Sequence, residues 1–255
     1  MQANYHTHTP RCRHAQGTER EYIENAVKGG LKILGFSDHA PYCFDGDYYS
    51  SFRMTREELP DYVNAVSALK EEYRNRLEIH LGVEIEYFPK YFAKTLELLR
   101  QQPIEYMILG QHFVGNETEK WYSGRESTEI DVLDFYCGQC IEAMQTGLFT
   151  YFAHPDLVVS TGSEAEYTRQ MRRLCRAAND CHVPMELNLL GIREGRHYPN
   201  PRFWQIAGEE GVSVVIGIDA HDPAHILRPD VEAKAMELVR DNGLDLLETV
   251  PLAGI

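Results

Sequence analysis

Residues 6–17 read HTHTPRCRHAQG, and this stretch marks the end of a strand that carries reactive side chains. The residues just before it, 3–6, are predicted to form a strand. Because side chains alternate between the two faces of a strand, His6 and His8 cannot both project from its regular part in one direction. Pro10 favours departure of the chain from a sheet, so one imidazole is expected beyond the strand. His14, on the loop that follows, is placed to fold back over this end.

The same alternation of short apolar runs with longer amphipathic stretches continues along the chain. The predicted strands cover residues 3–6, 33–37, 77–85, 106–112, 150–154, 184–188 and 212–218. Between them, apolar side chains recur at three- and four-residue steps, as in Val63, Val66 and Leu69, which is typical of a helix with one buried face. Strands alternating with helices predict a parallel α/β sheet. Over this length we expect one domain, residues 1–255, folded as a distorted TIM-like (β/α)7 barrel.

Composition and charge narrow the class of protein. The chain is 43% hydrophobic and 25% charged, which excludes disorder, and its net charge of −14 disfavours stable binding to nucleic acid. No secretory leader and no apolar stretch long enough for a membrane span is recognised, and the six cysteines suggest reduced thiols, so a cytoplasmic protein is expected. The pair Cys137 and Cys140 is interpreted as buried helix packing rather than a zinc ribbon. The sequence leaves the oligomeric state open.

Six of the seven predicted strands end in histidine, aspartate or glutamate. In a β/α barrel the C-terminal strand ends meet at one mouth, where chemistry takes place. The expected metal ligands are His6, His8, His14, His39, Glu84, His112, His154, Asp219 and His221. Imidazole and carboxylate donors suit zinc, manganese or iron, and nine donors exceed what one four- or five-coordinate ion accepts. With one bridging carboxylate, the set predicts three divalent ions.

Several segments of the chain resemble the polymerase and histidinol phosphatase (PHP) family of metal-dependent phosphoesterases and occur in the family's order. The resemblance is strongest to the histidinol-phosphatase branch. The segments span residues 6–221 and read HTHTPRCRHAQG, GFSDHAP, GVEIEY, ILGQHFVG, FAHPDL, NLLGIREGRHYP and GIDAH. The resemblance implies a distorted seven-stranded barrel with a trinuclear zinc, manganese or iron site. It implies that the first ion is held by His6, His8, Glu84 and Asp219. It also implies that Glu84 bridges to a second ion held by His112 and His154, and that the third is held by His14, His39 and His221.

The activity that the resemblance implies is hydrolysis of L-histidinol phosphate to L-histidinol and phosphate, a step of histidine biosynthesis. The expected nucleophile is a hydroxide shared by two metal ions. Neither a serine-nucleophile motif nor a glycine-rich phosphate loop is present, so arginine is expected to help bind phosphate. Arg193 is the first candidate and Arg53 the second. His197 is expected to reach the substrate, and Asp38 either to orient His39 or to protonate the leaving alkoxide.

Three other functions are considered. The first is a phosphoesterase of the same chemistry acting on phosphotyrosine, nucleotides or DNA ends, and the charge of −14 disfavours the last of these. The second is an amidohydrolase-like enzyme, which typically keeps two metal ions and has no use for His14. The third is a non-enzymatic scaffold that retains the barrel, and the complete set of ligand residues disfavours it.

Overall fold

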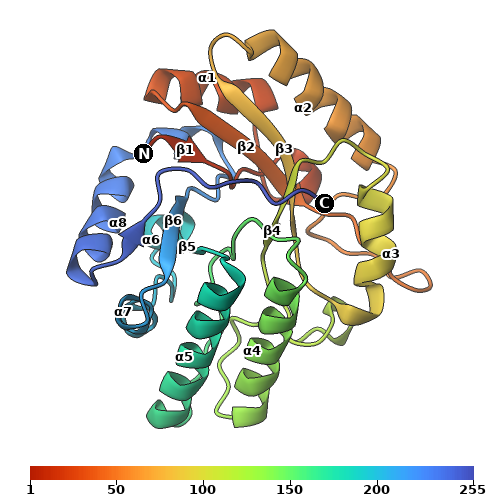
Figure 1. The fold of residues 1–255 in the computed structure, drawn as a ribbon. Coiled ribbons are helices and arrows are strands. Elements are labelled where there is room, and N and C mark those ends of the chain that lie inside the picture. The colour runs from red at the N-terminus through yellow and green to blue at the C-terminus, as the bar shows by residue number, and fades with distance from the viewer.

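The computed structural model of residues 1–255 shows a curled, parallel β-sheet surrounded by helices (Figure 1). The strands are β1 (Ala3–Asn4), β2 (Ile33–His39), β3 (Glu78–Ile85), β4 (Tyr106–Leu109), β5 (Met185–Asn188), β6 (Ser213–Gly217) and β7 (Asp245–Leu246). They form a four-stranded sheet, β1-β2-β3-β4, and a three-stranded sheet, β5-β6-β7, in which every pairing is parallel. The α/β barrel class expected from the alternating sequence pattern is confirmed.

Short bridges join the two sheets. Phe152 pairs in parallel with both Leu109 and Met185, and on the other side Thr7 pairs with Ala220. The expected strand at residues 150–154 is therefore wrong as a regular strand, because only its centre pairs. His154, with φ 35°, leaves the extended conformation and ends the pairing there.

Other strand boundaries also differ from expectation: β1 ends at Asn4 rather than at residue 6, and β3, β5 and β6 are each shorter by one or two residues. β2 continues two residues beyond the predicted end, to His39, and pairs there with Glu84. β4 ends at Leu109 rather than at residue 112, because the chain turns so that the His112 N–H donates to the Gly110 carbonyl at 3.0 Å. β7 was not anticipated, since two residues carry no periodic signal.

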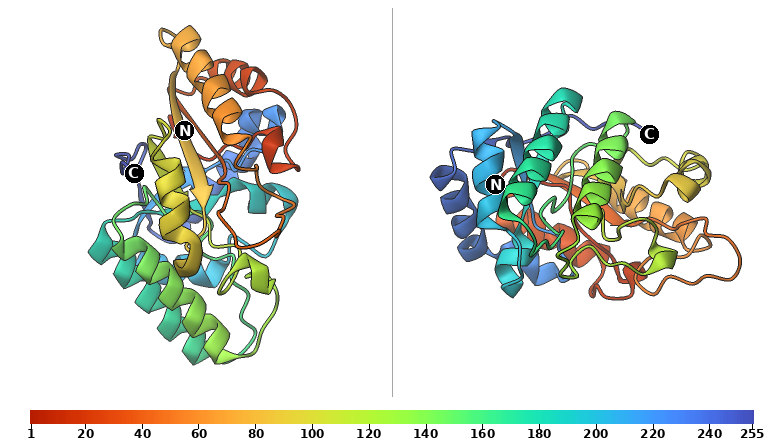
Figure 2. Two further views of the ribbon diagram at one scale, coloured as in Figure 1. Left: turned by 90° about the vertical axis from the view of Figure 1, so that its right-hand side faces the viewer. Right: turned by 90° about the horizontal axis from the view of Figure 1, so that it is seen from below.

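Eight α-helices connect the strands. They are α1 (Glu19–Gly29), α2 (Leu59–Tyr73), α3 (Pro89–Leu99), α4 (Ile130–Gln145), α5 (Glu164–Cys181), α6 (Leu189–Glu194), α7 (Pro201–Glu209) and α8 (Pro229–Asp241). The start of α1 is a capping box in which Thr18 and Glu21 satisfy each other's backbone N–H groups, and Gly30 ends the helix in the left-handed conformation. Both views in Figure 2 show α4 and α5 side by side, and these helices pack on each other.

Two apolar clusters hold the fold together. The larger one lies between sheet and helices and includes Val63 and Val66, as their spacing predicts. It also contains Cys137 and Cys140, both fully buried free thiols on α4, which agrees with a packing role. The smaller cluster includes Ala3 of β1 with Tyr5 just after it, and Tyr106 and Ile108 of β4, so these alternate residues share one face of the sheet. No helix combines the length and the apolar character that a membrane span requires.

Candidate metal centre

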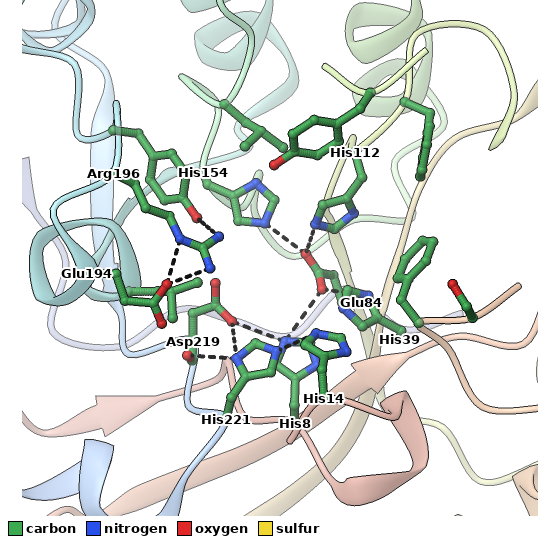
Figure 3. A pocket seen from close by; sticks show the side chains of 17 residues that line it. His8, His14, His39, Glu84, His112, His154, Glu194, Arg196, Asp219 and His221 are labelled. Carbon is green, nitrogen blue, oxygen red and sulfur yellow. Dashed lines mark hydrogen bonds and ion pairs between the residues drawn. The ribbon is translucent and has the colours of Figure 1, made fainter. Parts of the chain in front are cut away.

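The predicted ligands converge in one cavity of about 500 Å³. Eight of them line it: His8, His14, His39, Glu84, His112, His154, Asp219 and His221. The ninth, His6, is fully buried next to the cavity, with its Nε2 atom 3.6 Å from Glu84 Oε2. Figure 3 shows the labelled histidines pointing toward Glu84 and Asp219 from separate segments of the chain. The convergence expected at the mouth of the barrel is thus present.

Glu84 lies at the centre of the group, at the end of β3. One carboxylate oxygen, Oε2, faces three histidines, at 3.0 Å from His39 Nδ1, 3.5 Å from His8 Nε2 and 3.6 Å from His6 Nε2. The other, Oε1, lies 2.9 Å from His154 Nε2 and 3.6 Å from His112 Nε2. The two oxygens thus serve two different groups of histidines, as a bridging carboxylate requires.

Asp219 is the second carboxylate of the centre and follows β6. Its Oδ1 atom lies 3.2 Å from His8 Nε2, 3.5 Å from His6 Nε2 and 3.3 Å from His221 Nδ1. Asp219 has φ 50° and His154 has φ 35°, conformations that L-residues adopt at a cost in free energy. Both ligands thus follow sharp backbone turns, which direct their side chains into the cavity.

His14, His39 and His221 form a third group, whose donor atoms all lie within 4.8 Å of one another. The Nε2 atoms of His14 and His221 are 2.9 Å apart. His14 is held in place because its Nδ1 contacts the Cys12 carbonyl at 2.7 Å. The backfolding of the loop after residue 8, expected from the sequence, is present.

The donor atoms fit a set of divalent cations. Five buried atoms at the centre have no hydrogen-bond partner: His6 Nε2, His8 Nε2, His39 Nδ1, Glu84 Oε2 and Asp219 Oδ1. A buried polar atom without a partner costs about 1–3 kcal/mol, so five around one centre indicate that something else satisfies them. Imidazole nitrogen and carboxylate oxygen are the donors that zinc, manganese and iron accept.

Further carboxylates lie behind the histidines and orient them. Glu186 contacts His6 Nδ1 at 2.8 Å and Glu86 contacts His112 Nδ1 at 2.9 Å, so each ring presents its Nε2 to the centre. Such partners fix the tautomer and orientation of a ligating imidazole. Sequence reasoning missed both residues. The available signal was a carboxylate inside or directly after an otherwise apolar strand, in MELN and in EIHLGVEIE.

Asp38 acts on a different histidine from the one expected. Its Oδ1 lies 3.4 Å from His8 Nδ1 and accepts the His39 backbone N–H at 2.8 Å, with no contact to the His39 ring. The expectation that it orients His39 is therefore corrected to His8. Asp38 is fully buried, does not line the cavity, and accepts the Thr9 backbone N–H through Oδ2 at 3.3 Å.

Three predicted substrate residues lie away from the cavity wall. Arg53 is 2% exposed and its guanidinium is occupied by Glu86 and Glu117, so the expectation that it binds phosphate is corrected. Arg193 lies against the carbonyls of Ile218 and Asp219, at 3.4 and 3.5 Å, and does not line the cavity. His197 contacts the Leu157 carbonyl through Nε2 at 2.8 Å and is also absent from the wall.

Arg196, three residues after Arg193, is the arginine that lines the cavity. Its side chain is 40% exposed and pairs with Glu194 at 2.6 Å, while Nη1 donates to the Tyr198 hydroxyl at 3.0 Å (Figure 3). Arg196 was not anticipated from the sequence, because α6 ends at Glu194 and the turn after it decides which side chain lines the cavity.

The carboxylates strongly affect the titration of the histidines. Burial alone would lower the pKa of His6, but Asp219, Glu186 and Glu84 raise it to about 10 in the metal-free chain. Burial lowers the pKa of His221 and His39 well below the ordinary value. Since a histidine binds metal only through an unprotonated nitrogen, cations compete with a proton at His6.

A parallel β/α barrel with a histidine-carboxylate cluster at its strand ends defines the class of metal-dependent barrel enzymes. The model of the PHP domain matches residues 4–189, and the chain belongs to this family, which confirms the resemblance noted in the sequence.

Among curated relatives, the probable histidinol-phosphatase of Deinococcus radiodurans is 31% identical over 233 residues, covering 87% of this chain and 86% of that protein. The histidinol-phosphatase of Bacillus subtilis is 26% identical, covering 87% and 94%. Among solved structures, the histidinol phosphate phosphatase of Lactococcus lactis subsp. lactis, complexed with zinc, L-histidinol and phosphate, has a TM-score of 0.71. It is 19% identical and covers 98% of this chain and 96% of that one, which supports the fold.

Proposed function

We propose that this protein is a metal-dependent histidinol-phosphatase, which hydrolyses L-histidinol phosphate to L-histidinol and phosphate. The observation that carries the proposal is the convergence of nine histidine, glutamate and aspartate side chains on one site. Five of their buried ring nitrogens and carboxylate oxygens have no hydrogen-bond partner. Relatives aligned over 87% of the chain are named for this reaction, which supports the choice of substrate. We further propose that residues 1–255 form one catalytic domain and that it acts in the cytoplasm, in histidine biosynthesis.

The proposed centre holds three divalent ions of zinc, manganese or iron. His6, His8, Glu84 and Asp219 would hold the first, and Glu84 would bridge to the second, with His112 and His154. His14, His39 and His221 would hold the third, in keeping with the short distances within that group. When bound, such ions lower the pKa of water toward neutrality and neutralise phosphoryl oxygens.

The side chains around the ligands provide recognition. We propose that Arg196, rather than Arg193, donates to the substrate phosphate, because it lines the cavity and is held by Glu194 and Tyr198. The outer wall contains Phe52, Phe113, Tyr122 and Tyr198, aromatic surfaces on which an imidazole ring can stack. A substrate with a phosphate group at one end and an imidazole ring at the other matches a cavity that has an arginine for the phosphate and aromatic side chains for the ring.

The test measures phosphate release from L-histidinol phosphate and from a panel of phosphotyrosine, nucleoside monophosphates and glycerol phosphate. The expected result is a kcat/KM for histidinol phosphate at least about a hundredfold above the others, lost on chelation and restored by metal. Glu84→Gln should lower kcat by several orders of magnitude, with an unchanged circular dichroism spectrum. Equal rates across the panel would reject the substrate, and full activity without metal would reject the mechanism.

A further inference from the structure

Arg53 is a buried cation that the proposed reaction does not use. It lies in the connection between β2 and α2 and is 2% exposed. Its Nη2 donates to Glu117 Oε2 at 2.6 Å and to both Glu86 oxygens at 3.1 Å. Its Nη1 donates to the Ala40 carbonyl at 2.9 Å, and its Nε to Glu117 and Ser50. All three guanidinium nitrogens thus donate to protein acceptors, and Arg53 does not line the cavity.

The partners of Arg53 come from three successive strand ends. Ala40 directly follows β2, Glu86 directly follows β3, and Glu117 lies in the short helix Glu117–Glu119 of the loop after β4. The same three regions supply the proposed ligands His39, Glu84 and His112. One side chain therefore joins the segments that supply three of the nine proposed ligands.

Glu86 transmits this restraint to a single ligand. Its Oε1 accepts from His112 Nδ1 at 2.9 Å, and the opposite ring nitrogen, Nε2, faces Glu84 at 3.6 Å. His112 is the most exposed of the ligands around Glu84, at 17% of its side chain, and has less packing to hold it. Its orientation therefore depends on Glu86, and that of Glu86 on Arg53.

Charge explains why arginine is needed at this position. Glu86 is 1% exposed and Glu117 is 2% exposed, and both contact the same guanidinium nitrogen. Without a cation between them, two buried carboxylates that both contact one guanidinium nitrogen would repel each other and lose their hydrogen-bond donors. Glu86 would then lose the contacts from Arg53 that fix its position and turn away, and His112 would lose its fixed acceptor. A lysine keeps the charge but cannot make the forked set of contacts.

We propose that Arg53 is a positioning residue for the metal centre: through Glu86 it holds His112 in its metal-binding orientation, and through Glu117 it ties the loop that carries His112 to the connection between β2 and α2. This inference rests on the proposed role of His112 as a metal ligand.

The test measures metal binding rather than turnover. Wild type, Arg53→Lys, Arg53→Met and His112→Ala are equilibrated in zinc buffers of stepped free concentration and examined by elemental analysis. We expect both Arg53 variants to bind one ion about ten- to a hundredfold more weakly and the others normally. His112→Ala should lose that same ion, and Arg53→Met combined with His112→Ala should lose no further ion. Arg56→Met, an exposed arginine three residues on, is the matched control and should bind like wild type.

The possible results distinguish a failure of the role proposed for Arg53 from a failure of the proposal that His112 is a metal ligand. If His112→Ala loses an ion while folded Arg53→Lys binds all ions with wild-type affinity, the inference is overturned and the metal site stands. If His112→Ala retains every ion, the ligand assignment fails and the inference fails with it. Should Arg53→Met not fold, Arg53→Lys decides. Uniform weakening of every ion in folded Arg53→Lys would contradict a role through His112.

Discussion

At the scale of single residues, the proposed metal centre depends on a glycine, which has no side chain, as well as on its ligands. Gly110 follows β4, and a Cβ atom there would lie 2.0 Å from Glu84 Oε1. No contact that close is tolerated, so any larger residue at this position must displace the Glu84 carboxylate. The glycine is therefore required by the position of Glu84 and not by backbone conformation.

Gly110→Ala is expected to lower kcat/KM by about a hundredfold or more and to reduce bound metal, since Glu84 loses its place between two groups of histidines. The matched control is Gly138→Ala on α4, where the nearest atom would be 3.7 Å away. That change should leave activity intact and stabilise the fold by about 0.5–1 kcal/mol through helix propensity. Metal analysis and urea denaturation of both variants provide the measurement. Normal metal content in Gly110→Ala would contradict the argument.

At the scale of elements, two asparagines that cap helix N-termini differ in whether they also contact the proposed metal centre. Asn188 begins α6 by accepting the Leu190 N–H at 2.9 Å, and its amide also donates to Glu186 and Asp219 at 2.8 and 3.1 Å. Asn200 begins α7 by accepting from the Arg202 N–H at 3.0 Å, without a contact to the ligands. The first cap thus joins helix α6 to the metal centre, while the second only starts a helix.

Replacing either asparagine by alanine should cost about 1 kcal/mol of folding free energy, because each cap loses its acceptor. Only Asn188→Ala should also lower kcat/KM, by roughly tenfold or more, since Asp219 and Glu186 both lose a hydrogen bond. Chemical denaturation measures the first effect and steady-state kinetics the second. Equal kinetics in the two variants would show that α6 does not support the site.

At the scale of the whole molecule, one end of the barrel carries the proposed metal centre, and the other end carries ion pairs that stabilise the fold. The proposed metal ligands lie at the C-terminal end of the barrel, whereas Glu105 lies just before β4, at the opposite end. It accepts the Leu81 N–H at 2.7 Å and pairs with Lys70 and His80. Burial would raise the pKa of Glu105, but the hydrogen bonds from His80 and Lys70 lower it to about 2.

Glu105→Gln should reduce stability at pH 7 without changing metal content. The folded pKa lies below the value of 4.5 for a free carboxyl, so folding favours the ionised form. This stabilisation is complete above pH 4.5 and is lost as the pH falls toward 2. Urea denaturation should show a deficit of about 1–2 kcal/mol at neutral pH that narrows at acidic pH. Exposed Glu97→Gln is the control, and a deficit independent of pH would exclude this origin.

Metal removal affects the whole fold. Ions that bind only the folded chain stabilise it, by about 4 kcal/mol per site at a free concentration a thousandfold above Kd. A chelator should therefore lower Tm markedly, and added zinc or manganese should restore it. A chain shown by elemental analysis to be metal-free, yet melting at the temperature of the loaded chain, would contradict the proposed centre.

The barrel class and the nine candidate ligands could be predicted from sequence, because both are local properties. Apolar runs mark strands, and His39 or Asp219 at the end of such a run must emerge at the barrel mouth whichever strands become neighbours. Short elements were less accessible. The segment around Phe152 pairs at a single residue and β7 has only two, so neither has a period that a sequence pattern can reveal.

The sequence by itself determined which side chains reach the mouth of the barrel, since their position follows from the strand that carries each of them. Only the tertiary structure decided which residues support these side chains and which arginine lines the cavity. Glu186 orients His6 and Asp38 orients His8, whereas Arg53 is buried and Arg196 faces the cavity. These relations join residues far apart in the chain. They depend on distances of a few ångströms and on which face a loop residue presents, and the packing of the closed barrel sets both.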